Sequence, residues 1–127
     1  MMRFLRIENI MLFHEKIIRE TGGSSGIRDR GLIESALNRA FMTYDGKDLY
    51  PGIKEKISVI AHSLISNHGF VDGNKRIGVA VMIILLKMNN IKVSYTQQEL
   101  IDLGLKTAEG LINEENILNW INEHLTK

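Results

Sequence analysis

The segment IKEKISVIAHSLISNHGFVDGNKRIGVAVMIILL, residues 53 to 86, decides the fold of this 127-residue chain. Its first part, residues 53 to 67, has apolar residues at three- and four-residue spacing, which predicts a helix with one buried face. Its last part, residues 77 to 86, is apolar almost without a break, and a helix that is apolar on nearly all sides belongs in the middle of a bundle. The intervening residues, HGFVDGNKR, therefore connect the end of one helix to the start of the next.

This connecting segment, His68 to Arg76, has residue types suited to phosphate chemistry. The first turn of a helix offers free backbone N–H groups and the positive end of the helix dipole, and Gly73 lets the backbone approach an oxyanion closely. We expect Gly73 and Asn74 to form a backbone anion cradle. Lys75 and Arg76 are predicted to clamp phosphate oxygens with their charges.

Two further residues predict that the segment is catalytic. Asp72 is badly placed beside a phosphate unless a divalent cation lies between them, so we interpret it as a magnesium ligand. Histidine ordinarily titrates near neutrality, and His68 is therefore predicted to be the general base that takes a proton from an incoming hydroxyl. Phe70 is interpreted as a core anchor for the loop. A Walker A loop is excluded because the glycine spacing is too short and no Ser or Thr follows Lys75.

The segment resembles the signature of the Fic/Doc superfamily, His-x-Phe-x-(Asp/Glu/Asn)-(Gly/Ala)-Asn-(Gly/Lys)-Arg, at every fixed position. Further likeness to the death-on-curing (Doc) branch comes from Gly22-Gly23, Gly26-Ile27-Arg28-Asp29-x-Gly31 and Leu49-Tyr50-Pro51, so the resemblance covers most of the chain. It implies an all-α Fic-fold bundle of about six helices around a buried central helix, in a single domain over residues 1–127.

Position 75 separates two reactions within the superfamily. Members that transfer AMP have glycine there, whereas Doc-type members have lysine, as this chain does, and bind ATP inverted so that the γ-phosphate faces the histidine. The resemblance therefore implies a protein Ser/Thr kinase that uses ATP and Mg²⁺ and acts on a protein substrate, with the translation elongation factor Tu as the expected target.

Two departures from the Doc pattern keep a second reaction open. Gly73 stands where the Doc type has alanine, and Gly69 stands where proline is common after the histidine. A Fic-type nucleotidyl transferase that moves AMP onto a protein is therefore the alternative enzyme hypothesis. A catalytically silent helical binding module is the third hypothesis, and the intact motif argues against it.

Control of the activity is expected to come from another protein. Self-inhibited Fic proteins contain a Ser/Thr-x-x-x-Glu-(Gly/Asn) motif, which this sequence lacks. In the Doc type the restraint is an antitoxin whose C-terminal segment folds on binding. The resemblance thus implies the toxin of a toxin–antitoxin pair that blocks translation.

Composition limits the other classes. The chain is 44% hydrophobic, which is enough for one compact domain with a core. A net charge of +1 with interspersed acids and bases predicts neither a nucleic-acid nor a membrane partner, and the apolar run from Ile77 is shorter than the roughly 20 residues of a membrane span. The absence of cysteine and of a signal-peptide core predicts a cytoplasmic protein.

The remaining sequence predicts four helices and two irregular segments. The first helix runs from Ile7 to Glu20 and is stopped by Gly22-Gly23, and the second is capped by Asp29. A turn-rich segment from Tyr44 to Gly52 corresponds, by the resemblance, to the superfamily's target-positioning flap, and residues 91–95 form a weakly extended segment. A capping box at Thr96 to Glu99 opens the third of these helices, and the fourth starts at Asn113. His14, His62 and His124 show no metal-ligand spacing, and we interpret them as structural or surface residues.

Overall fold

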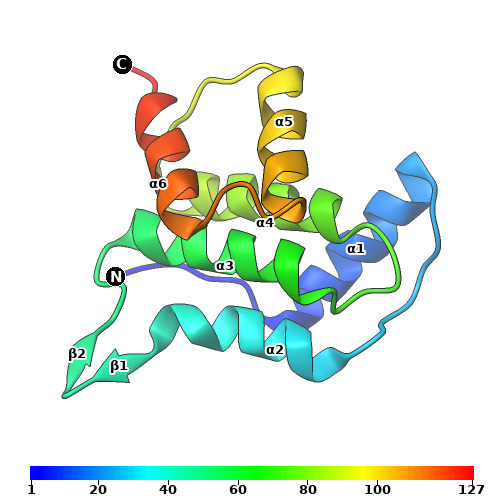
Figure 1. Ribbon diagram of the computed structural model, residues 1–127, viewed down its shortest axis with the longest axis horizontal. Helices are drawn as coiled ribbons and strands as arrows, with labels where there is room; N and C mark the ends of the chain where they lie inside the picture. Colours follow the sequence, from blue (N-terminus) through cyan, green and yellow to red (C-terminus); the bar gives the residue numbers. More distant parts are fainter.

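The computed structural model describes residues 1–127, and the chain is almost entirely helical (Figure 1). Its elements are α1 (Ile7–Thr21), α2 (Arg30–Asn38), the short 3₁₀ helix η1 (Arg39–Phe41), β1 (Thr43–Tyr44), β2 (Lys47–Asp48), α3 (Ile53–Asn67), α4 (Asn74–Met88), α5 (Gln97–Ala108) and α6 (Glu114–Glu123). The predicted all-α fold is confirmed, since β1 and β2 form only a small antiparallel hairpin. The expected extended segment near residue 93 makes a single bridge, between Val93 and Leu125.

The predicted helix ends have the expected caps. Gly22 is the C-cap of α1, and its N–H donates to the Ile18 carbonyl. Asp29 caps α2 by accepting a hydrogen bond from Leu32 N–H. The capping box at the start of α5 and the Asn113 cap of α6 are also present. These local signals could be read from sequence because each one satisfies backbone groups within one helical turn.

Helix α3 lies in the middle of the bundle and packs against α2, α4, α5 and α6 (Figure 1). Its buried side chains include Ser58 and Ser63 as well as aliphatic residues. Ser58 Oγ donates to the Lys54 carbonyl at 2.8 Å, so this hydroxyl is buried with a partner. Ser63 Oγ accepts from Arg39 Nη1 at 3.2 Å. The sequence pattern predicted one buried face for α3, but the structure buries the helix on several sides, and α3 and α4 together form the buried centre.

The contact between α3 and α4 is close because of a glycine. A Cβ atom at Gly78 would overlap the Ile65 side chain and lie 3.2 Å from the Ala61 carbonyl oxygen. The Ile65 side chain therefore packs directly on the Gly78 backbone, and the two helices approach closely at this point. This contact fixes the end of α3 relative to the start of α4, where the predicted site residues lie.

The hairpin of β1 and β2 projects from the bundle beside the N-terminal end of α3 (Figure 1). The buried Lys56 holds its base, because Nζ donates to Asp48 Oδ2 at 3.1 Å and to the Tyr50 carbonyl. Fifteen residues of helix, about 22 Å at 1.5 Å per residue, separate this end of α3 from His68. The expected flap therefore lies at the far end of α3, and not beside the predicted catalytic residue.

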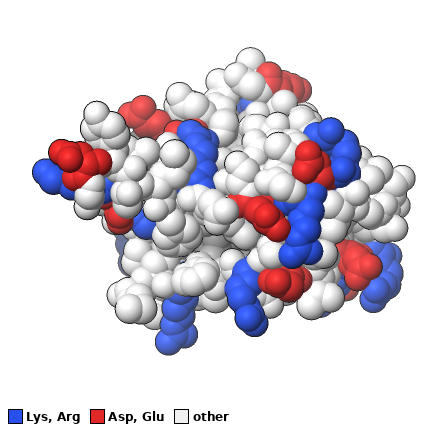
Figure 2. All heavy atoms as spheres, turned by 90° about the horizontal axis from the view of Figure 1, so that it is seen from below, with Lys and Arg blue, Asp and Glu red and all other residues white.

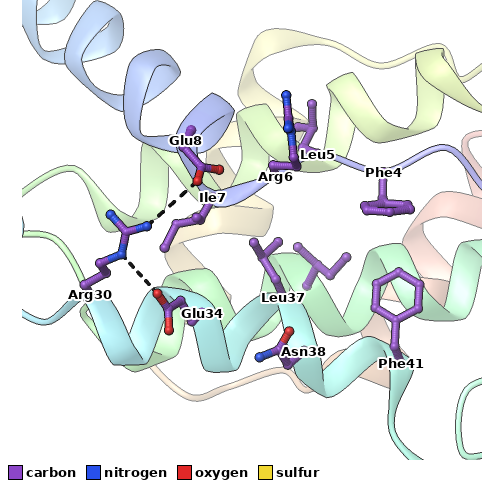
Figure 3. A pocket seen from close by; sticks show the side chains of 11 residues that line it. Phe4, Leu5, Arg6, Ile7, Glu8, Arg30, Glu34, Leu37, Asn38 and Phe41 are labelled. Carbon is purple, nitrogen blue, oxygen red and sulfur yellow. Dashed lines mark hydrogen bonds and ion pairs between the residues drawn. The ribbon is translucent and has the colours of Figure 1, made fainter.

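A groove of about 560 Å³ runs between the N-terminal segment and α2 (Figure 3). At one end the rings of Phe4 and Phe41 meet edge to face, with centroids 5.6 Å apart. At the other end Arg30 pairs with Glu34 at 3.0 Å and with Glu8 at 4.0 Å. None of the lining residues belongs to segment 68–76, so this groove is separate from the predicted site.

Charged side chains of both signs are interspersed over the face shown in Figure 2, in keeping with 16 basic and 15 acidic residues in the chain. This face therefore offers no patch of a single sign that would attract a polyanion. No helix combines the length and the apolar character that crossing a membrane requires.

Candidate active site

His68 ends α3 at the point where the chain turns toward α4. It is the C-cap of the helix in the left-handed conformation, with φ 54°, and the residue is exposed. Its carbonyl accepts a hydrogen bond from Arg28 Nε at 2.6 Å, and Arg28 Nη2 donates to the Asn67 carbonyl at 3.3 Å. The connection between α1 and α2 thus fixes the backbone of His68 and leaves the imidazole facing outward.

The next residues are anchored by Phe70, which is only 2% exposed. On one side of it the Gly69 carbonyl accepts from Arg28 N–H and Asp29 N–H at 2.8 and 2.9 Å, and on the other Val71 N–H donates to the Gly26 carbonyl at 3.1 Å. The prediction that Phe70 is a core anchor agrees with this burial. Backbone hydrogen bonds to residues 26–29 therefore hold the middle of the loop in place, in addition to the helices at its two ends.

Close packing explains why residue 69 is a glycine. A Cβ at this position would lie 2.5 Å from Ile33 Cγ1 and 3.3 Å from the Asp29 carbonyl oxygen. The loop passes so close to the start of α2 that a side chain does not fit. The glycine at this departure from the superfamily pattern is thus explained by the neighbouring helix.

Asn74, the first residue of α4, holds the loop with its side chain. Asn74 Oδ1 accepts from Phe70 N–H at 3.0 Å, and Asn74 Nδ2 donates to the Phe70 carbonyl at 3.1 Å. Both polar groups of this amide are therefore used inside the protein. Asn74 can contribute only its backbone N–H to an anion cradle, as the sequence interpretation specified.

The N-terminus of α4 has no capping side chain. Gly73 occupies the N-cap position with φ 75°, and no acidic residue lies in the first turn. The backbone N–H groups of Asn74, Lys75 and Arg76 make no hydrogen bond within the protein. Free donors of this kind, together with the positive end of the helix dipole, can bind an anion such as phosphate.

Asp72 lies beside this helix end with its carboxylate fixed by backbone donors. Ser24 N–H donates to Oδ2 at 3.0 Å and Gly73 N–H donates to Oδ1 at 2.8 Å. These two hydrogen bonds, with a smaller effect from Arg76, hold the pKa of the Asp72 carboxyl below its usual value. Asp72 is therefore ionised at neutral pH, which is the form that binds a cation.

A metal at Asp72 would need ligands from outside the protein. No group of three or more His, Cys, Asp or Glu residues is placed to hold a metal ion. A single carboxylate nevertheless fits the way Mg²⁺ binds at nucleotide sites, where one or two carboxylates, substrate phosphates and waters complete the coordination. The donor set at Asp72 fits magnesium under that condition.

The two cations of the first turn have different surroundings. Arg76 Nη1 donates to Thr21 Oγ1 and to the Gly22 carbonyl, each at 2.6 Å, while Nη2 lies 3.7 Å from Asp72 Oδ1. Lys75 is exposed, and its stem lies beside Gly104 of α5. Arg76 is thus already oriented by the end of α1, and Lys75 is free of ion pairs.

A shallow cavity of about 400 Å³ brings the predicted residues together. Its lining consists of His68, Asp72, Gly73, Asn74, Lys75 and Arg76, with Ile65, Val71 and Ala108. All six residues predicted from the sequence therefore share one hollow at the junction of α3, α4 and the end of α5.

Sequence reasoning missed the contribution of α1 and of the loop after it. A Cβ at Gly23 would lie 2.6 Å from Asp72 Oδ2 and 2.9 Å from Arg76 Nη2, which shows how closely this loop covers the site. The available signal was the Gly22-Gly23 pair, which the sequence analysis used as a helix stop and as a likeness to the Doc branch, without a role at the site. The interpretation of His14 as a structural residue agrees with its burial, but the sequence did not predict its contact with the Asp72 carbonyl.

The geometry defines an α-helical protein in which an exposed histidine shares a cavity with the free N–H groups of a helix N-terminus. A model of the family described as Fic/DOC matches residues 4–86, which include the whole loop. The chain belongs to this Fic/DOC family.

Two named relatives are similar to the chain. It is 36% identical over 93 residues to a protein named Toxin Doc from Mycolicibacterium smegmatis, a match that covers 73% of the chain and 67% of that relative. It is 28% identical over 123 residues to a protein named Protein kinase doc from Escherichia phage P1, with 94% of each protein covered.

Proposed function

We propose that this protein is a Doc-type toxin that transfers the γ-phosphate of ATP to a Ser or Thr hydroxyl of a target protein. The observation that carries the proposal is the single shallow cavity that His68 shares with Lys75 and with the first turn of α4, whose N–H groups are free. By resemblance, lysine at this position favours the orientation of ATP that presents its γ-phosphate. The names of the two relatives, one a toxin and one a protein kinase, agree with this assignment.

The proposed roles follow from the contacts. The imidazole of His68 takes the proton of the attacking hydroxyl as its oxygen bonds to the γ-phosphorus and the bond to ADP breaks. The N–H groups at the start of α4 bind phosphate oxygens, and Lys75 adds a mobile positive charge. Arg76, held by Thr21 and Gly22, presents its remaining N–H groups from a fixed position.

Magnesium is proposed as the second cofactor, held by Asp72. When bound, the ion neutralises charge on the phosphates. Ser24 and Gly73 keep the carboxylate ionised and oriented for this task.

One of the two sequence departures no longer favours AMP transfer. Gly73 has φ 75°, and a Cβ there would lie 3.0 Å from Ile18 Cδ1. Backbone conformation and the packing of α1 therefore account for glycine without reference to the size of a nucleotide pocket. Nucleotidyl transfer remains the alternative that the experiment must separate.

The test is incubation of the protein with bacterial elongation factor Tu or a whole bacterial extract and ATP labelled at the γ- or the α-phosphate. We expect label on a protein from γ-labelled ATP alone, and mass spectrometry should find the mass of one phosphate on Ser or Thr. His68→Ala, whose exposed side chain supports no core packing, is the control and should lose about 10²- to 10⁴-fold in rate. Label from α-labelled ATP would replace the kinase assignment with nucleotidyl transfer.

We further propose that a separate antitoxin restrains the protein in the cytoplasm, where ATP and translation factors are available. The absence of the self-inhibitory motif supports an external restraint. Expression of the chain alone should stop bacterial growth, and expression of His68→Ala at the same level should not. Equal growth arrest by both proteins would contradict a toxic enzymatic activity.

A further inference from the structure

His14 is a buried polar residue that the proposed chemistry does not use. It lies in the middle of α1 and is 1% exposed. Its Nε2 atom is 2.6 Å from the carbonyl oxygen of Asp72, a residue 58 positions later in the chain. Its ring also stacks on Phe70, with ring centroids 3.8 Å apart and planes 14° apart.

The partner atom determines which ring nitrogen of His14 must carry a hydrogen. A carbonyl oxygen can only accept a hydrogen bond, so Nε2 of His14 must be the donor. The hydrogen bond therefore has a direction, from α1 to the loop. Without this donor, the partly buried Asp72 carbonyl would lose its His14 partner at the point where the loop turns into α4.

The accepting carbonyl belongs to the peptide unit that joins Asp72 to Gly73. The N–H of this same peptide unit is the Gly73 donor that binds Asp72 Oδ1 at 2.8 Å. A peptide unit is planar, so fixing the carbonyl direction fixes the direction of the N–H group. Through one rigid plane, His14 therefore helps to orient the Asp72 carboxylate, which the Gly73 N–H holds beside the start of α4.

We propose that His14 is a positioning residue for the phosphoryl-transfer site, and that its Nε2–H holds the Asp72–Gly73 peptide plane in the orientation that binds the magnesium–nucleotide complex. This inference rests on the proposed function for the identity of the ligand. His14 itself touches neither nucleotide nor metal, since it lies behind the loop in the core. Residues that orient metal ligands in this way typically change affinity or activity 10- to 100-fold when removed.

Three substitutions separate the hydrogen bond from packing. His14→Phe keeps an aromatic ring against Phe70 and removes the donor, whereas His14→Gln loses the ring and keeps an N–H group at a similar reach. Ile10→Ala is the matched control, because Ile10 lies one turn earlier in α1, is fully buried and has no side-chain hydrogen-bonding group. It measures what a general loss of core packing in α1 does to the site.

The first measurement is calorimetric binding of a non-hydrolysable ATP analogue with Mg²⁺ to the full-length protein. We expect the His14→Phe protein to bind at least about tenfold more weakly than wild type, with His14→Gln within about threefold of wild type and Ile10→Ala unchanged. Equal weakening by His14→Phe, His14→Gln and Ile10→Ala would overturn the proposal in favour of simple packing.

The second measurement, amide NMR without any ligand, keeps the proposal testable if the proposed function fails. His14→Phe should shift the Gly73 and Ser24 amide resonances and speed hydrogen exchange at Gly73, while His14→Gln and Ile10→Ala leave them near their wild-type values. If no nucleotide binds to wild type, the proposed function is contradicted, and the NMR result alone decides the role of His14. Unchanged Gly73 and Ser24 amides in His14→Phe would overturn the proposed role of His14.

If His14→Phe does not fold, the His14→Gln protein decides between the outcomes. Wild-type binding and wild-type hydrogen exchange at Gly73 in that protein support the proposal, and their loss overturns it.

Discussion

Removal of the Asn74 amide is predicted to destabilise the loop between α3 and α4 by a measurable amount. Asn74 makes two hydrogen bonds to the backbone of Phe70, at 3.0 and 3.1 Å. Each contributes roughly 1 kcal/mol, and a buried partner left unpaired costs about 1–3 kcal/mol. Because Phe70 is 2% exposed, water replaces the lost partners poorly. We expect Asn74→Ala to lower the free energy of unfolding by about 2–4 kcal/mol.

Asn74→Asp separates the two hydrogen bonds. The carboxylate can still accept from Phe70 N–H, but it cannot donate to the Phe70 carbonyl and places a negative charge beside it. An acidic residue in the first turn of α4 also gains about 0.3–1 kcal/mol from the helix dipole. The net loss should therefore be about 1–2 kcal/mol, between wild type and Asn74→Ala.

Urea unfolding followed by circular dichroism measures both variants, with the slope of the free energy against urea checked for constancy. Ser66→Ala, at an exposed position near the end of α3, is the control and should change stability by less than about 0.5 kcal/mol. A loss below about 0.5 kcal/mol for Asn74→Ala would refute the reasoning, because it would mean that the Phe70 backbone finds other partners without cost.

Three further predictions concern the site and the C-terminal helices. Asp72→Ala should make transfer respond weakly to added Mg²⁺, as measured by a magnesium titration of the rate, and full wild-type transfer in excess chelator would show that Asp72 has another task. Lys75→Gly should reduce transfer from γ-labelled ATP, and an unchanged rate would remove the lysine from the phosphate clamp. The contact of His124 Nε2 with Glu99 Oε2 at 2.6 Å should make stability depend on pH. Hydrogen bonding to His124 lowers the pKa of Glu99 to about 2. Burial alone would lower the pKa of His124, but its hydrogen bonds to Glu99 and to the Trp120 carbonyl raise that pKa above 6.5. The contribution of His124 is thus full below pH 6.5 and lost as pH rises through its folded-state pKa, while that of Glu99 is full above pH 4.5 and lost as pH falls toward 2. Thermal unfolding of wild type and of Glu99→Gln between pH 4 and 9 checks this. Wild type should be more stable than Glu99→Gln at the lower end of this range, and most of this difference in stability should disappear at high pH.

The helices and the six predicted site residues could be identified from the sequence because their signals are local. The capping box at Thr96, the stop at Gly22 and the loop from His68 to Arg76 each act within one or two turns of chain. Residues close in sequence at a helix junction are close in space for any arrangement of the other helices. The six predicted residues of the cavity therefore followed from the motif alone, whereas Ala108 of α5 did not.

The contacts from α1 could not be predicted in the same way, because they depend on how a distant helix packs. Nothing near His14 in the sequence indicates that it faces Asp72, since a lone histidine on an amphipathic helix is usually a core or surface residue. The position of the hairpin is a similar case. Its turn residues were evident, but its distance from His68 depends on the direction of α3, along which the intervening residues run as one straight element.

The segment from Thr21 to Ser24 lies where its surroundings should change when a ligand binds to the site. It contacts both Asp72 and Arg76 through hydrogen bonds, so a ligand that engages these two side chains changes the immediate surroundings of this segment. Ser25, the next residue, is exposed, and the chain contains no cysteine. A Ser25→Cys protein can therefore carry a single fluorescent dye, whose emission would follow site occupancy without a labelled nucleotide, a known target or turnover.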